Sequence, residues 1–235
     1  MPVAAPALPS NSLIEGMTPA DRLRILKLCR PVDLVLGAIL CEADRPLRYV
    51  YFPLTGFISL VATVSSHPPL EMGLIGSEGL LGATLVLGIN KARLQGVVQG
   101  AGTALRMTST QVRRELKRSP ALCRIFNQYL YVMLAQLSQT AVCTRFHHIE
   151  ARLARWLLMT HDRAHGDQFY LTHKFLADML GVQRSAVTIA AGALQARRLI
   201  RYTRGEISIQ SRKGLEARSC ECYEATNRDY AELFV

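Results

Sequence analysis

The sequence predicts an α+β fold that consists of an N-terminal antiparallel β-roll of jelly-roll type, one long helix and a C-terminal winged helix-turn-helix. Three observations predict it. Short apolar stretches split by glycine, proline and polar turns fill residues 31–107, as is typical of antiparallel strands. A helical pattern with apolar residues at steps of three and four follows over residues 120–145. Residues 171–210 then combine two short helical patterns, joined at Gly181, with an alternating hairpin.

The composition describes a globular chain with a large excess of positive charge. Its 235 residues suffice for two modest domains, and a hydrophobic content of 49% argues against disorder. The formal net charge is +10. This charge favours a polyanionic partner, nucleic acid or an anionic membrane, over an enzyme with an acidic substrate, and it does not choose between those two partners.

The N-terminal residues 1–17 are expected to form a flexible tail. The first twelve residues lack a basic segment, and Pro2, Pro6 and Pro9 interrupt their apolar residues, so they predict neither a signal peptide nor a membrane span. Elsewhere the apolar runs are short and interrupted by glycine. We therefore expect a cytoplasmic protein without a membrane partner.

Residues 18–118 are predicted to form the β-roll domain with a helix at each end. Thr18 and Pro19 are a favourable start for a short packing helix. The strands are expected in the four apolar stretches that follow, and a short basic helix over 108–118 closes the domain. The strand-forming stretches are VDLVLGAIL, YVYFPLTGFISLVATV, LEMGLIG and LQGVVQGAGTALRM.

The long helix, residues 119–145, carries a heptad-like apolar seam and a second apolar face. Tyr129 and Val132 lie on the second face. A helix with two apolar faces needs two partners, of which one is the roll and the other a second copy of the same helix. The alternative is a core helix packed wholly within one chain. The predicted dimer interface consists of Phe126, Leu130, Met133, Leu137 and Thr140.

The C-terminal domain, residues 146–235, contains the helix-turn-helix pattern. Thr172 caps the first helix and Gly181 supplies the left-handed residue that ends it. The second helix should bury Val187, Ala191 and Leu194 and turn its opposite face to a partner. The alternative is an ordinary helical hairpin with small residues. The outward face carries Arg184, Ser185, Thr188 and Ile189.

The hairpin after the second helix is the predicted wing. Residues 199–210 alternate apolar and polar residues around Arg204 and Gly205, a favourable pair for a tight turn. Basic residues concentrate in this region, with Glu206 nearly the only acid, and provide the charge that a polyanion requires. They are Arg197, Arg198, Arg201, Arg204, Arg212 and Lys213.

No catalytic arrangement is evident, so we predict neither an enzyme nor a cofactor nor a metal site. The histidines lack a nucleophile or a carboxylate pair at a usable spacing. Among six cysteines only Cys220 and Cys222 are close in sequence, and a zinc site normally needs two further ligands at a recognisable spacing. We therefore interpret this pair as small residues on a C-terminal helix.

The order of roll, long helix and winged helix-turn-helix resembles the Crp/Fnr family of bacterial transcription regulators. The likeness is most specific in Leu171-Thr-x-x-x-Leu-Ala-x-x-Leu-Gly-x-x-Arg184-x-x-Val187 and in Leu194-x-x-x-x-Leu199-Ile. It covers nearly the whole chain after the first dozen residues, and in the roll it includes the stretches YFPLTG and IGSEGLLG. The resemblance implies a homodimer that binds an inverted-repeat site in double-stranded DNA, with RNA polymerase as a partner if the protein is an activator.

The resemblance also implies a DNA-contact set, in which Arg184 matches an arginine that commonly reads guanine. Ser185 and Ile189 differ from the base-reading residues of the best-known member, so its half-site should not be transferred. The alternative function is a ligand-binding or protein-interaction module whose winged helix docks protein rather than DNA. The predicted DNA-binding residues are Thr172, His173, Gln183, Arg184, Ser185, Thr188, Ile189 and Arg204.

The roll departs from the cyclic-nucleotide-binding members of that family. Where those members hold the ribose and the phosphate with charged and hydroxyl side chains, this chain has Leu80, Leu94 and Gln95. Residues 1–28 also lack the cysteines of the iron-sulfur members. The effector is therefore unknown or absent, and we do not expect it to be cyclic AMP.

Overall fold

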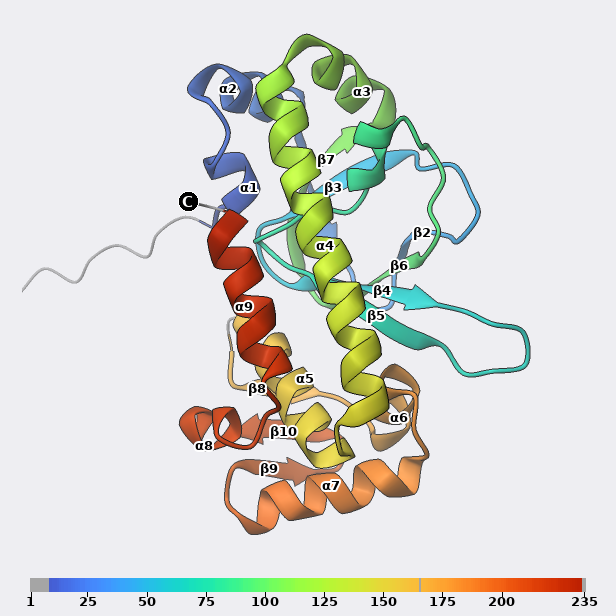
Figure 1. The fold of residues 1–235 in the computed structure, drawn as a ribbon, viewed down its shortest axis with the longest axis vertical. Helices are drawn as coiled ribbons and strands as arrows, with labels where there is room; N and C mark the ends of the chain where they lie inside the picture. Colours follow the sequence, from blue (N-terminus) through green and yellow to red (C-terminus); the bar gives the residue numbers. More distant parts are fainter. Residues whose placement is uncertain (1–8, 165, 234–235) are drawn as a thin grey trace, which may run out of the picture.

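The computed structural model describes residues 9–164 and 166–233, and it contains the three predicted parts (Figure 1). A β-roll packs against one side of a long helix, and a small helical domain with a three-stranded sheet lies at the far end of that helix. The α+β fold class is confirmed. Among the described residues no helix has both the length and the apolar character that crossing a membrane requires.

Two antiparallel sheets form the roll, and their strands lie in the four stretches predicted for them. One sheet has the order β1-β7-β3 and the other β2-β6-β4-β5. Between the sheets lies a small apolar core that includes Ile58, Ile75 and Val98. The strands are β1 (Arg30–Leu34), β2 (Ile39–Cys41), β3 (Tyr49–Pro53), β4 (Phe57–Ala62), β5 (Leu70–Ile75), β6 (Gln95–Gly100) and β7 (Gly102–Thr108), with a 3-10 helix η1 (Ala83–Leu87) between β5 and β6.

The N-terminal segment joins the roll earlier than the sequence suggested. Asn11 caps α1 (Ser12–Glu15), and its amide nitrogen donates to the carbonyl oxygens of Pro53, at 3.0 Å, and Gly79, at 2.8 Å. Leu13 and Ile14 are fully buried. The prediction of a tail through residue 17 is therefore wrong from Asn11 onward, because two apolar side chains bury themselves here; residues 1–8 lie outside the described residues. The next helix, α2 (Pro19–Leu28), begins at the predicted cap Thr18.

Two helices follow the roll as predicted, α3 (Ser109–Arg118) and the long α4 (Pro120–Phe146). The roll-facing side of α4 is fully buried at Phe126 and Tyr129. Phe126 is 0% exposed in the chain's own core, so its assignment to a dimer interface is wrong. Leu130 and Met133 are half-buried and pack against the same core. The outward apolar side chains of α4 are instead Tyr131, Leu134, Val142 and Phe146.

The last helix, α9 (Cys222–Leu233), returns from the C-terminal domain and runs beside α4 (Figure 1). Tyr230 is buried in the apolar core between α4 and the roll, which also contains Phe126 and Tyr129 and is called the roll-side core below. Its hydroxyl accepts a hydrogen bond from the side-chain amide of Gln136 at 3.3 Å. The sequence predicted one C-terminal domain over residues 146–235 and did not predict that its last helix packs beside α4. The helix therefore covers part of α4 that the sequence left available to another partner.

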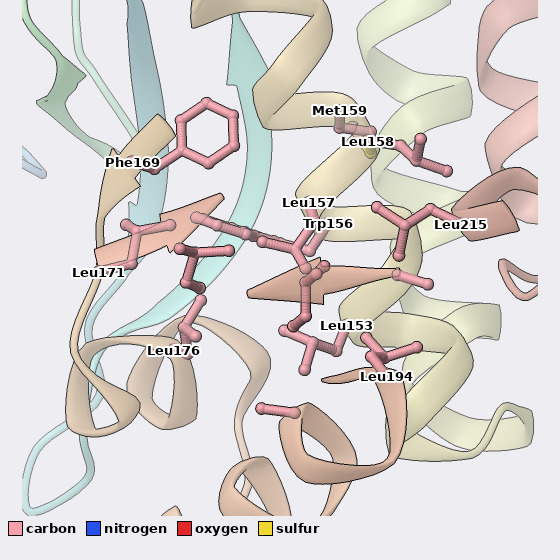
Figure 2. Close-up of a cluster of buried hydrophobic side chains, with 14 of the residues drawn as sticks. Leu153, Trp156, Leu157, Leu158, Met159, Phe169, Leu171, Leu176, Leu194 and Leu215 are labelled. Atoms are coloured by element: carbon pink, nitrogen blue, oxygen red, sulfur yellow. The ribbon is translucent and has the colours of Figure 1, made fainter. Parts of the chain in front are cut away.

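The C-terminal domain packs its helices around α5 (Ile149–Ala164), and Figure 2 shows the apolar side chains that meet there. Leu153 and Leu157 of α5 are fully buried together with Leu176 and Leu194 from the two helices of the helix-turn-helix. The same core includes Phe57 and Leu74 from the roll, so the two domains share apolar packing. The other elements are β8 (Gln168–Tyr170), α6 (His173–Leu180), α7 (Arg184–Ala196), β9 (Ile200–Thr203), β10 (Glu206–Ile209) and α8 (Arg212–Glu216).

A buried carboxyl group connects the roll to the C-terminal domain. Trp156 Nε1 on α5 donates to Glu71 Oε1 on β5 at 2.7 Å, and Ser59 Oγ lies 2.6 Å from Glu71 Oε2. Burial raises the pKa of Glu71 to about 7, even though both hydrogen bonds favour its charged form. Glu71 is therefore partly protonated near neutral pH, at a contact between two domains.

We predict that Glu71 makes the stability of the chain depend on pH. From pH 4.5 to about 7 the folded state keeps a proton that the unfolded state loses, so the free energy of unfolding falls as the pH rises. The fall is on the order of 3 kcal/mol, and it levels off above that window. Urea titrations across this range should lose most of the decline in Glu71→Gln, since the amide mimics the protonated acid. The control Glu42→Gln, at an exposed site, should keep the decline. If the free energy of unfolding falls equally with pH in both variants, Glu71 is not the group responsible.

Candidate nucleic-acid interface

The two helices of the helix-turn-helix form for the local reasons that the sequence indicated. Thr172 Oγ1 accepts from the Phe175 amide at 3.1 Å and caps α6. Gly181 ends α6 in the left-handed region, at φ 64° and ψ 42°. The inward stripe of α7 is buried at Val187, Ala191 and Leu194, as predicted.

The opposite face of α7 is exposed to solvent. Arg184 occupies the first helical position, and the side chain of the cap residue Gln183 makes no capping hydrogen bond. Ile189 is 73% exposed, which is unusual for a large apolar side chain. Ser185 and Thr188 lie between them and are also exposed. This face offers a guanidinium, an amide, hydroxyls and a methyl-rich side chain, which are the groups that read base edges in a major groove.

The wing is a hairpin of β9 and β10 with the predicted tight turn. Arg204 and Gly205 have φ values of 51° and 90°, as a two-residue hairpin turn with both central residues in the left-handed region requires. Arg204 is exposed at the tip. The sequence did not predict the third strand, β8, which pairs with β10 just before α6. A Cβ atom on Gly205 would lie 3.1 Å from the Tyr170 ring, so β8 also supports the wing turn.

His173 connects α6, α7 and the wing. Its ring stacks on Tyr202, with 4.4 Å between centroids, and its Nδ1 lies 2.9 Å from Thr188 Oγ1. Burial, and then the charge of Arg184, lowers the pKa of His173 below its usual value, so the ring is neutral near pH 7. The Thr188 hydroxyl also donates toward the Arg184 carbonyl at 3.1 Å. His173 therefore orients Thr188, a role that its sequence position alone could not reveal.

Four of the six basic residues predicted around the wing remain available to a partner. Arg197 pairs with Glu150 at 3.0 Å, and Arg212 is held by Asp162 at 2.7 Å and by Glu216 at 3.0 Å. For the remaining four, no carboxylate lies within salt-bridge distance among residues 9–164 and 166–233, so their charge is directed at solvent. These are Arg198, Arg201, Arg204 and Lys213.

The glycine-rich turn of the roll is filled by the chain itself. A Cβ atom on Gly79 would collide with the Tyr129 hydroxyl at 2.1 Å, and one on Gly73 would collide with Gln136 Oε1 at 2.3 Å. Leu80 beside Gly79 is fully buried in the roll-side core. These glycines therefore permit the close approach of α4, and an apolar side chain occupies the position where a ribose-binding carboxylate would stand.

Comparisons with known proteins agree with this arrangement. Residues 151–218 match the family model of the Crp-like helix-turn-helix domain. A structure described as a Crp/Fnr-family transcriptional regulator from Eubacterium rectale superposes with a TM-score of 0.70 and 14% identity, over 88% of this chain and 96% of that one. FixK2 from Bradyrhizobium japonicum has a TM-score of 0.68 and 15% identity, over 82% and 98%. A Crp/Fnr-family regulator from Thermus thermophilus has a TM-score of 0.67 and 20% identity, over 81% and 98%.

No curated protein matches the chain in sequence. At these identities the solved structures establish the fold, and the family model identifies residues 151–218 as a Crp-like helix-turn-helix domain. The chain carries a Crp-like helix-turn-helix domain within the fold of Crp/Fnr transcription regulators.

We predict opposite effects on stability from alanine at two glycines of this domain. In Gly181→Ala a left-handed residue gains a Cβ that would lie 2.8 Å from Leu70 Cδ1, so the free energy of unfolding should fall by about 1–3 kcal/mol. In Gly192→Ala, within α7, the added Cβ meets nothing within 4 Å, and a better helix former should raise that free energy by about 0.5–1 kcal/mol. Thermal and urea unfolding measure both changes, and a loss of stability in Gly192→Ala would contradict the open placement of that face.

Proposed function

Because residues 151–218 form a Crp-like helix-turn-helix domain within a Crp/Fnr-type fold, we propose that the protein is a homodimeric regulator of transcription that binds an inverted-repeat DNA site. The observation that carries the proposal is the exposed face of α7 beside a wing with unpaired basic residues. RNA polymerase is a partner if the regulator activates transcription.

Each outward side chain has a role that follows from its place on the domain. Arg184, in the first turn of α7, reads a guanine edge, and Ile189 contacts a thymine methyl group further along the groove. Thr172 and Arg204 contact phosphates on either side and fix the register of the helix without reading sequence. Thr188 contributes less than its exposure suggests, because its hydroxyl is already bonded within the chain.

The dimer forms through the outward apolar face of α4. Tyr131 is 68% exposed and Leu134 is 61% exposed, one helical turn apart, and Val142 and Phe146 continue the exposed apolar residues toward the C-terminal domain. Two such helices packed about a two-fold axis would bury these side chains. The same axis presents two copies of α7 to DNA, so the half-sites are separated by roughly 10–10.5 base pairs between centres.

We do not expect the roll to bind cyclic AMP as a signal. Leu80 is fully buried and Leu94 packs against the core between the sheets, so these positions provide apolar packing where a cyclic nucleotide would require charged groups. The roll then serves as the structural base of the regulator, or it senses a different signal.

We predict that Arg184→Ala weakens binding to the selected site by at least about ten- to a hundred-fold and relaxes preference at one base position of each half-site, because the dimer loses one bidentate arginine-guanine contact in each half-site. Selection of bound sites from random duplexes, followed by fluorescence anisotropy, measures both effects. An unchanged preferred sequence, or selected sites without inverted symmetry, would show that α7 is not the recognition helix.

The matched comparison is Arg204→Ala in the wing. This variant should weaken all duplexes alike, because a phosphate contact carries no base identity. It should reduce the magnitude of the slope of log affinity against log salt by about 0.9 for each wing, or about 1.8 for the dimer. If neither variant changes DNA binding and wild-type binding does not depend on salt, the winged helix docks another macromolecule and the DNA assignment fails.

We predict that replacing Tyr131 and Leu134 together by glutamate yields monomers, since four carboxylates would meet across the two-fold interface without partners. Light scattering on the wild type and the variant measures the mass. The control is Leu87→Glu with Ile89→Glu, a pair 59% and 50% exposed on the roll, which should leave the dimer intact. A wild type that is monomeric, or an α4 variant that stays dimeric, would refute this interface.

A further inference from the structure

Three cysteines and one histidine meet at the junction between α4 and α9. Cys143 lies in the last turn of α4 and His147 caps that helix, so the two side chains are one turn apart on the same face. Cys220 precedes α9 and Cys222 is its first residue. One ligand atom from each of the four residues lies within 4.8 Å of the others, and all three thiols are buried.

We propose that these four residues bind a zinc ion in a Cys₃His site that fixes the end of α4 to the start of α9. The inference goes beyond DNA binding and does not depend on it. The sequence alone predicted no metal site, because the two halves of this ligand set are 77 residues apart.

Two of the distances between the four ligand atoms are close to the edge lengths of a tetrahedral zinc site. Zinc binds sulfur at about 2.3 Å and nitrogen at about 2.0 Å, so neighbouring ligand atoms of a tetrahedron lie about 3.5–3.8 Å apart. Cys143 Sγ lies 3.6 Å from Cys220 Sγ, and Cys222 Sγ lies 3.3 Å from His147 Nδ1. A closed set of four sulfur and nitrogen ligands is characteristic of structural rather than catalytic zinc.

The polar side chains around the cluster are those expected around metal ligands, and they are not expected in an apolar core. His147 presents Nδ1 to sulfur while its Nε2 lies 3.1 Å from Glu221 Oε1, the carboxylate-histidine arrangement that orients ligating imidazoles. Gln139 Nε2 lies 2.9 Å from Cys222 Sγ as a donor to sulfur. Buried cysteines that merely fill space would need neither the imidazole nor the amide.

The charge around the site also favours a negatively charged metal cluster. Arg155 is 8% exposed and lines the same small cavity as Cys143, yet its Nε and Nη2 atoms are buried without a hydrogen-bond partner in the described chain. Three thiolates, a neutral histidine and a zinc ion carry one net negative charge. The buried guanidinium of Arg155 favours a cluster that carries this negative charge, and it also favours the charged form of Glu71, which lines the same cavity.

The first test is the metal content of the full chain, purified under reducing conditions without a metal-binding tag. We expect one zinc ion per chain by mass spectrometry. After removal of zinc, cobalt should restore occupancy and produce the thiolate charge-transfer and strong visible bands of a tetrahedral site. Absence of both zinc and cobalt binding overturns the proposal, as does iron with acid-labile sulfide, or a Cys143–Cys220 disulfide in the freshly purified reduced chain.

The second test distinguishes ligands from packing residues. Cys143→Ser and Cys222→Ser should abolish stoichiometric zinc, whereas the triple change of Cys29, Cys41 and Cys123 to serine should keep it. His147→Cys should retain zinc as a Cys₄ site, and Glu221→Gln should weaken affinity by about tenfold through the imidazole. These two variants keep the test decisive if the serine variants fail to fold. Zinc retained in Cys222→Ser, or lost only in the triple variant, overturns the ligand assignment.

Discussion

The packing of α5 against the roll determines where α7, the proposed recognition helix, lies. Trp156 of α5 bonds to the buried Glu71, and Arg163, farther along α5, pairs with Glu78 at 2.7 Å. Removing one partner from such a buried pair leaves an uncompensated charge and costs several kcal/mol. Because α7 packs on α5, and Phe57 and Leu74 join the same apolar core, the roll and α7 belong to one continuously packed unit.

Helix α4 illustrates why a heptad pattern could not identify its partners. The pattern placed Tyr129 on a second apolar face, and this face packs against the roll. It assigned Phe126 to a second chain, although that side chain is fully buried within the first. Apolar residues occupy most of the circumference of α4, so periodicity indicates burial without naming what covers each face. The packing of α9 on α4, including the contact of Tyr230 with Gln136, determines which part of α4 is covered within the chain. These two residues are almost a hundred positions apart in the sequence.

The features that could be predicted from the sequence are those fixed by near neighbours. The Thr172 cap, the left-handed Gly181 and the Arg204–Gly205 turn each depend on a few consecutive residues whose backbone preferences agree. The stack of His173 on Tyr202 and the meeting of Cys143 with Cys220 depend on the assembled fold. The sequence therefore predicted which side chains of the candidate site face outward, but it did not predict the contacts that orient them.

The connection between α4 and α5 is only two residues long, His147 and His148, and it lies beside the proposed metal ligands. A short connection held by a metal restricts the C-terminal domain at one end of α5, while Glu71 and Glu78 restrict it farther along that helix. A reorientation of α5 and α7 relative to the roll would therefore break the two carboxylate contacts and the apolar packing that the two domains share. Since burial raises the pKa of Glu71 to about 7, the first of these contacts changes its charge near neutral pH and is the weaker restraint. β5, where Glu71 lies, therefore carries the contact with α5 whose charge changes near neutral pH.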